Sequence, residues 1–182
     1  MGGLDSAKDW MRRFVGVVRP LATKEYPLRI ISFNYDYLLE RAMKMYWPGS
    51  EQLYAKIEDA VEFIYPHGRL AELPDEVLDP QAFISRLATN LRVGENADTS
   101  SRARAREVIA ESDRIFSVGF SFSDTNVRLL GLDMQKMSVV YVQNYENKDL
   151  RLARKLSQWQ LPQSRVDPGD MNTLVMNGFF EQ

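Results

Sequence analysis

The chain has 182 residues, of which 45% are hydrophobic and 26% are charged, an ordinary composition for one globular domain with a packed core. Its formal net charge of -2 supplies no general attraction to nucleic acid or to an anionic membrane surface. The chain contains no cysteine, which excludes disulfide bonds and thiolate zinc ligands.

Hydropathy and the amino-terminal residues bear on where the protein resides. No apolar run approaches the roughly 18 residues that a membrane-spanning helix needs, and the start of the chain lacks a signal-peptide pattern. Together with the absence of cysteine, these features predict a cytoplasmic protein that is not inserted in a membrane. We expect a single domain over residues 1–182.

The first predicted element is an amphipathic helix over residues 5–19. Trp10, Phe14 and Val18 recur at helical spacing on one face, and Pro20 is expected to end the helix. A helix with one apolar face packs that face against the rest of its domain.

Residues 29–43 predict a strand, a polar turn and a helix in direct succession. An apolar, β-favouring run is followed by the turn Asn34-Tyr35-Asp36, and four apolar residues then share one helix face: Leu38, Leu39, Ala42 and Met43. In an open α/β sheet, ligands bind at the carboxyl ends of the strands, so this corner is a place where chemistry is feasible. Asp36 has a simpler alternative role, because aspartate is a preferred helix cap.

Three further predicted strands also end in small or polar residues. They are residues 62–65 followed by Pro66-His67-Gly68, residues 114–118 followed by Gly119 to Asp124, and residues 138–143 followed by Asn144. His67 is the only histidine of the chain. Because parallel strands deliver their carboxyl ends to one edge of a sheet, the pattern predicts an α/β fold with a shared site at that edge.

Several of these side chains have a purely structural alternative. A histidine beside a glycine is common in turns, so His67 alone does not indicate a catalytic base. Asp124 precedes a helical segment and is fully explained as a helix cap. The alternating arginines of residues 101–106 spread around a helix instead of lining one face, which argues against a nucleic-acid surface.

The remaining segments predict helices and connections. They are a helical insertion at residues 73–113 with helices at 80–91 and 101–112, an amphipathic helix at 147–159, a turn-rich connection at 162–170, and a short closing helix or extended tail at 171–180.

The polar motifs follow one another in a particular order. They are Ser32 to Asp36, His67-Gly68, Val118 to Ser121, Ser123-Asp124 with Asn126, and Asn144. This ordered set resembles the motifs of the Sir2 superfamily, in its zinc-free SIR2-like branch from bacterial anti-phage defence proteins. The resemblance implies a Rossmann-like three-layer fold with a mostly parallel sheet. Deacylating members carry a four-cysteine zinc ribbon after the His-Gly motif, and its absence here argues against deacylation.

The resemblance further implies a domain that binds NAD as its substrate and hydrolyses it to nicotinamide and ADP-ribose without a metal. Cleavage of the bond to nicotinamide passes through an oxocarbenium-like transition state and needs a positioned nucleophile and a base. The amide of Asn34 is suited to hold a water or a ribose hydroxyl, and His67 can act as the base. The implied cofactor-binding residues are Asp36, Gly68, Gly119, Ser121 and Asn144.

Four of these residues have implied roles toward the dinucleotide. Asp36 would orient the nicotinamide carboxamide or the Asn34 loop. Gly119 and Ser121 would let the backbone approach the phosphates and a ribose, and Asn144 would contact the adenosine ribose.

One family motif has no counterpart in this chain. The family begins with a strand and a Gly-Ala-Gly-x-Ser loop that holds the dinucleotide phosphates, and no such strand precedes Gly2-Gly3. We therefore expect a sheet without its first strand, in either an adapted fold or, preferably, a fragment of a longer protein. Two functions stay open: an NAD+ hydrolase of anti-phage defence, controlled by homo-oligomerisation or partner domains, or a non-catalytic module that binds NAD or ADP-ribose or mediates assembly. ADP-ribosyl transfer ranks third.

Overall fold

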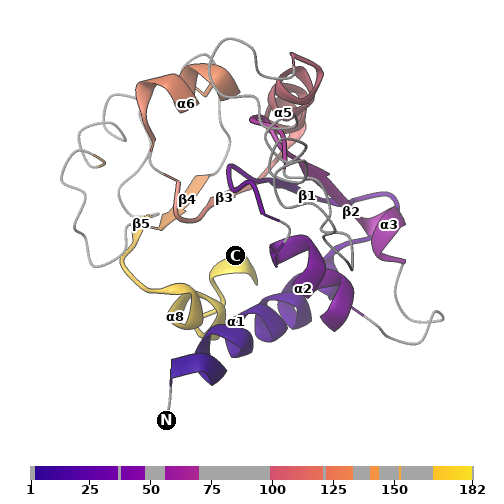
Figure 1. The fold of residues 1–182 in the computed structure, drawn as a ribbon, viewed down its shortest axis with the longest axis vertical. Helices are drawn as coiled ribbons and strands as arrows, with labels where there is room; N and C mark the ends of the chain where they lie inside the picture. Colours follow the sequence, from indigo (N-terminus) through magenta and orange to yellow (C-terminus); the bar gives the residue numbers. More distant parts are fainter. Residues whose placement is uncertain are drawn as a thin grey trace, which may run out of the picture. The chain divides into compact units, whose positions relative to one another are not determined.

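The computed structural model describes residues 3–36, 38–47, 56–69, 99–120, 122–132, 140–143, 152 and 166–181. The chain divides into two units: unit 1 comprises Met1–Val18 and Arg106–Gln182, and unit 2 comprises Arg19–Ala105. Each unit combines helices with short parallel strands, which confirms the predicted α/β class (Figure 1). Within the described ranges, no helix has the length and apolar character that crossing a membrane requires.

Unit 2 is built around two parallel strands. β1 (Leu28–Ile31) pairs with β2 (Val61–Ile64), and Ile31 lies opposite Ile64. The pairing extends one residue further, because the N–H of Ser32 donates to the carbonyl oxygen of Ile64 at 2.9 Å. Both predicted strands are confirmed, and they end at the same edge of their sheet.

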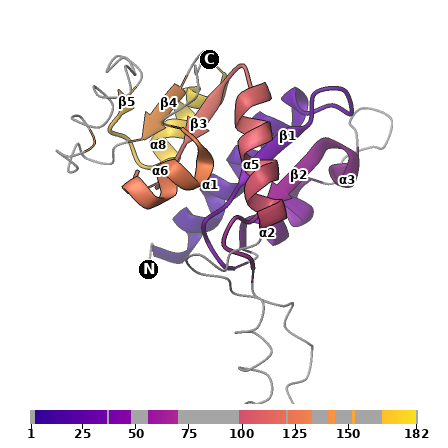
Figure 2. The same ribbon diagram turned by 90° about the horizontal axis from the view of Figure 1, so that it is seen from above.

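The other elements of unit 2 are η1 (Arg19–Leu21), α2 (Leu38–Tyr46), α3 (Ile57–Ala60) and the first part of α5 (Thr99–Glu111). Because side chains alternate along a strand, Glu62 and Tyr65 point to opposite faces of the sheet. Glu62 binds Arg104 of α5, and Tyr65 binds Glu40 of α2. The first part of α5 and helix α2 therefore lie on opposite faces of β1 and β2 (Figures 1 and 2).

Helix α2 buries its middle and exposes its first residue. Ala42 and Met43 are buried, and Met43 has no exposed surface. Leu38, by contrast, is 63% exposed, although it shares a helix face with these residues in the sequence pattern. Leu38 is the first residue of α2 and lies one turn before the buried part of the helix.

Unit 1 contains a three-stranded parallel sheet in the order β3-β4-β5. β3 (Ile115–Ser117) and β4 (Val140–Gln143) confirm two predicted strands, with Phe116 opposite Tyr141. β5 (Val166–Asp167) lies in the segment that was expected to be only a turn-rich connection. Its two residues are too few to produce an alternating pattern in the sequence.

A cluster of aromatic rings packs on one face of this sheet in unit 1. The rings of Phe116 and Tyr141 stack with their centroids 4.9 Å apart, and Phe179 packs edge-on against both at 5.5 and 5.9 Å. Phe180 contacts Phe14 at 5.0 Å. Phe14 comes from α1 (Gly3–Val18), while Phe179 and Phe180 come from η5 (Phe179–Glu181). The aromatic cluster therefore joins distant parts of the chain.

Two short helices complete unit 1. α6 (Asp124–Leu130) begins at Ser123, whose side chain accepts the N–H of Asn126, so the helix cap is Ser123 and not Asp124. α8 (Met171–Met176) begins at Asp170, which caps it by accepting the N–H of Thr173. Figure 1 shows α6 on one side of the strands and α1 and α8 on the other.

The remaining predicted helices are covered by the described residues to different extents. Helix α1 confirms the amphipathic amino-terminal helix, and Pro20 lies in the turn that follows it. Helix α5 covers the second helix expected in the insertion at 73–113, while the helix at 80–91 lies outside the described residues. Of residues 147–159 only Leu152 is described; it is helical and buried. The single domain over 1–182 stays a prediction.

Candidate functional site

The candidate site in unit 2 begins with the loop that follows β1. The hydroxyl oxygen of Ser32 accepts the backbone N–H of Asn34 at 3.2 Å, a local bond that bends the chain just after the strand. Asn34 is exposed at this bend. Its backbone is thereby held at the carboxyl end of β1 while its side chain faces solvent.

A tight turn follows the neighbouring strand β2. The N–H of Gly68 donates to the carbonyl oxygen of Tyr65 at 2.9 Å, and Pro66 is fully buried within the turn. Proline suits the second position of such a turn because its φ is fixed. Gly68 has a φ of 75°, a left-handed conformation that glycine adopts without strain. The turn fixes the backbone on both sides of His67.

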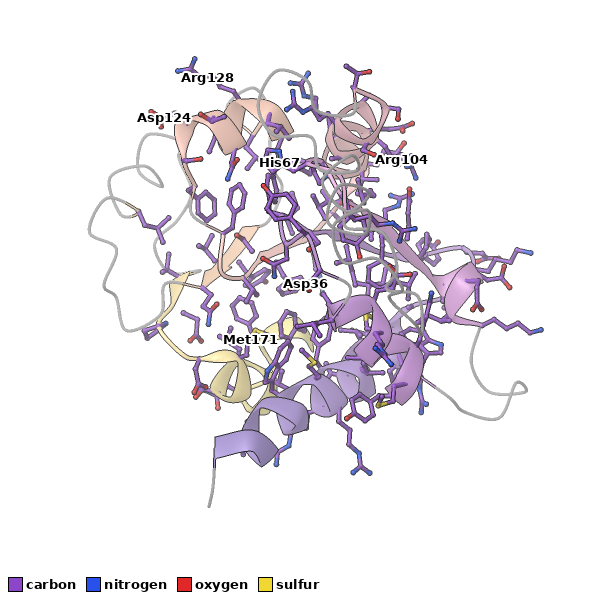
Figure 3. All side chains as sticks on the ribbon, viewed as in Figure 1. Asp36, His67, Arg104, Asp124, Arg128 and Met171 are labelled. Carbon is purple, nitrogen blue, oxygen red and sulfur yellow. The ribbon has the colours of Figure 1, made fainter. Side chains whose placement is uncertain are left out.

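His67 lies against the loop that carries Asn34. The centroid of its ring is 5.2 Å from the ring centroid of Phe33, in an edge-to-face arrangement, and 6.5 Å from the ring centroid of Tyr35. Phe33 and Tyr35 are the two neighbours of Asn34 in the chain. The structure therefore brings the histidine turn and the asparagine loop together; Figure 3 labels His67 and Asp36 in this part of the molecule.

His67 is half-buried, and one of its two imidazole nitrogens has no hydrogen-bond partner among the described residues. Its Nδ1 atom is buried, and no side chain or backbone group in the described part of the chain forms a hydrogen bond with it. A partner on one imidazole nitrogen normally selects which nitrogen carries the proton. The described residues leave that selection open.

Asp36 caps the helix that leaves the loop. Its Oδ1 accepts the N–H of Leu38, the first residue of α2, at 3.0 Å. The capping alternative for Asp36 is therefore confirmed. Its second carboxylate oxygen forms no hydrogen bond with the residues that the structure describes, and the implied contact with a carboxamide stays a prediction.

Glu40 of α2 was not singled out from the sequence, although it contacts the histidine turn. Its Oε2 accepts the hydroxyl of Tyr65 at 3.2 Å and the Nη1 of Arg69 at 3.1 Å, and its Oε1 accepts the Nζ of Lys44 at 2.9 Å. Burial acts to raise the pKa of Glu40. The hydrogen bond and charge of Lys44, with the hydroxyl of Tyr65 and the charge of Arg69, outweigh burial and lower this pKa below its usual value.

A second carboxylate of unit 2 belongs to an ion-pair cluster. The guanidinium of Arg104 donates to both carboxylate oxygens of Glu62 at 2.7 Å, and Arg29 approaches Oε2 at 3.8 Å. The hydrogen bonds from Arg104 are the main reason that the pKa of Glu62 is lowered, and they outweigh the opposing effect of burial. Arg104 therefore has a structural partner in Glu62.

In unit 1, a bridging side chain holds the loop that follows β3. Gly119 has a φ of 62°, and its N–H donates to the Oε1 of Gln143 at 3.2 Å. The Nε2 of Gln143 donates to the carbonyl oxygen of Gly169 at 2.7 Å, just beyond β5. Gln143 at the end of β4 thus ties together the ends of the flanking strands. It was not singled out from the sequence either.

The other predicted contacts of unit 1 are described incompletely. Ser121 and Asn144 lie outside the described residues. Phe122, beside Ser121, is buried with a φ of 47°, which is uncommon for an aromatic residue and indicates that packing constrains this loop.

Neither a metal site nor a known relative points to the chemistry. The described ranges contain no group of three or more histidine, aspartate or glutamate side chains placed to hold a metal ion. A scan against protein-family models and searches of curated proteins and solved structures found no significant match. A function for this chain therefore rests on its own residues and their contacts.

Proposed function

We propose that the chain is an NAD-binding SIR2-like domain that hydrolyses NAD+ to nicotinamide and ADP-ribose. The domain would have a Rossmann-like three-layer fold with a mostly parallel sheet that lacks the family's first strand. It would act in the cytoplasm in anti-phage defence, with control by homo-oligomerisation or by partner defence domains. No metal takes part in the proposed reaction.

The contact between His67 and the Asn34 loop is the observation that supports this proposal. In the sequence, only the order of the motifs relates Asn34 to His67, because the two residues are more than thirty positions apart. Both neighbours of Asn34 contact the His67 ring, at the carboxyl ends of two parallel strands. Such ends are where open α/β sheets bind ligands.

The proposed reaction uses the two side chains in different ways. Asn34 positions a water at the anomeric carbon of the nicotinamide ribose through its amide, and His67 takes the proton of this water as its oxygen attacks. The bond from ribose to nicotinamide breaks, and its electron pair leaves with nicotinamide. The products are nicotinamide, ADP-ribose and one proton.

The remaining assignments derive from the resemblance. Asp36 would orient the nicotinamide carboxamide or the Asn34 loop, and Gly68 would contact NAD. Gly119 and Ser121 would contact the phosphates and a ribose, and Asn144 would contact the adenosine ribose.

Nicotinamide release from NAD+ tests the proposal directly. The wild-type chain is expected to release nicotinamide, and His67→Ala is expected to lower kcat by about 10²- to 10⁴-fold, the usual contribution of a positioned base. Asn34→Ala is expected to lower kcat as well. Asn177→Ala is a matched control, because Asn177 is an exposed asparagine at the end of α8.

Three outcomes would contradict the proposal in different ways. Equal turnover by the wild-type chain and both variants would remove Asn34 and His67 from the mechanism. Release of acyl groups from lysine peptides would show that the assigned substrate is wrong and that acylated peptides are the substrate. Binding of NAD or ADP-ribose without turnover, measured by calorimetry, would instead identify a non-catalytic module.

A further inference from the structure

Glu40 contacts both sides of the turn that carries His67. Tyr65 is the first residue of the turn and Arg69 directly follows it, and both donate to the same oxygen of Glu40, at 3.2 and 3.1 Å. The Arg69 guanidinium also lies over the Tyr65 ring, 5.6 Å from its centroid. The two ends of the segment are thus joined to each other and to helix α2.

The same helix also begins at the loop that carries Asn34. Asp36 caps α2, and Glu40 lies one turn further along it. Helix α2 is therefore bonded to the asparagine loop at its start and to the histidine turn through Glu40. A single rigid element of this kind can set the distance between two side chains that come from different strands.

The burial of Glu40 distinguishes it from an ordinary surface ion pair. Its side chain is 12% exposed, whereas that of Glu62 in the neighbouring cluster is 34% exposed. Exposed pairs contribute little because water screens them. A mostly buried carboxylate that loses its donors is costly, so the contacts of Glu40 constrain the turn strongly.

We propose that Glu40 is a positioning residue that holds the His67 turn against the Asn34 loop. Its effect on turnover rests on the proposed NAD hydrolysis, whereas its effect on the ring of His67 does not. Glu40 itself takes no part in bond breaking.

Proton NMR of the single histidine tests the positioning directly. The imidazole signals of His67 need no assignment among several histidines, and the nearby rings of Phe33 and Tyr35 should displace them from their positions in the unfolded chain. Glu40→Ala is expected to move these signals toward the unfolded positions. Glu40→Gln is expected to retain most of the displacement, because its amide oxygen still accepts from Tyr65 and Arg69.

Matched variants separate positioning from general loss of structure. Glu62→Ala removes a carboxylate of the same unit that does not contact the turn, and it should leave the His67 signals in place. Arg69→Gln replaces the charged guanidinium with a shorter neutral amide without altering the core, and it should give a partial shift even if Glu40→Ala fails to fold. Unchanged signals in both Glu40→Ala and Arg69→Gln would overturn the proposal.

Turnover supplies the second measurement. Because displacement of a catalytic group by about 1 Å can cost about 100-fold in rate, Glu40→Ala is expected to lower kcat by up to about that factor with little change in KM. Glu40→Gln should recover much of the loss, and Glu62→Ala should match the wild type. A wild-type chain without turnover would refute the NAD hydrolysis, while the NMR signals would still decide the positioning role.

Discussion

The His67 turn of unit 2 and the Gly119 loop of unit 1 follow parallel strands in similar ways, yet they are held by different chemistry. A carboxylate holds the first: Glu40 accepts from Tyr65, Arg69 and Lys44. A neutral amide holds the second, since Gln143 joins two backbone groups. Contacts of charged groups depend on pH and salt, whereas an amide bridge responds to neither. The two loops should therefore respond differently to the same change in solution.

The largest expected effect is the loss of the Gln143 bridge. Gln143→Leu leaves the Gly119 N–H and the partly buried Gly169 carbonyl without their partner, at a cost of about 1–3 kcal/mol in the free energy of unfolding. Urea denaturation measures the loss, and hydrogen exchange should increase for peptides that contain Gly119.

Asp167→Asn is the companion control for this variant. Asp167 Oδ1 accepts the Gly169 N–H at 2.7 Å, and asparagine keeps an acceptor oxygen at that position. Stability should change little. If Gln143→Leu is as stable as the wild type, the bridge does not hold the Gly119 loop.

A smaller effect is expected from the Tyr65 hydroxyl. Tyr65→Phe keeps the buried ring but removes one donor from Glu40, which should lower the free energy of unfolding by about 0.5–1.5 kcal/mol in urea denaturation. Tyr26→Phe is the matched control, because Tyr26 is 75% exposed and should tolerate the change. Equal losses in both variants would show that the bond to Glu40 contributes nothing.

The smallest effect is the pH dependence of the carboxylate contacts. Folding lowers the pKa of both Glu40 and Glu62 below the ordinary value of 4.5. Each carboxylate therefore stabilises the folded protein at pH values above 4.5. This contribution is lost as the pH falls through the lower pKa of the folded state. The difference in unfolding free energy between the wild type and Glu40→Gln should be below about 1 kcal/mol near neutrality and should shrink toward pH 3.

The Gln143→Leu variant sharpens this pH comparison. Its stability deficit should stay constant over the same pH range, because neither the glutamine nor its two backbone partners titrate. A deficit that disappears in acid would mean that the Gly119 loop also depends on a charged group.

Local sequence patterns predicted the helices and strands better than the contacts between them. The apolar runs around Ile30, Phe63 and Phe116 gave strands close to their observed limits, because a run of such residues favours an extended chain locally. Helical spacing placed Leu38 and Ala42 on one face, but spacing does not show at which turn a helix reaches the core. The exposed Leu38 is the result.

The order of the polar motifs in the sequence predicted that Asn34 and His67 belong to one site. The residues that hold the loops, Glu40 and Gln143, could not be found in this way. Glu40 lies 25 positions from Tyr65, and Gln143 lies 24 positions from Gly119. Only the Glu40–Lys44 pair, four residues apart on one helix, leaves a local signal in the sequence.

The discontinuous make-up of unit 1 has a consequence for protein synthesis. Residues 19–105 emerge from the ribosome as one continuous stretch, so unit 2 can begin to fold while translation continues. The ring of Phe14 in α1 has to wait, because its partner Phe180 is made 166 positions later. An apolar helix face that stays uncovered for so long is prone to associate with other chains during translation.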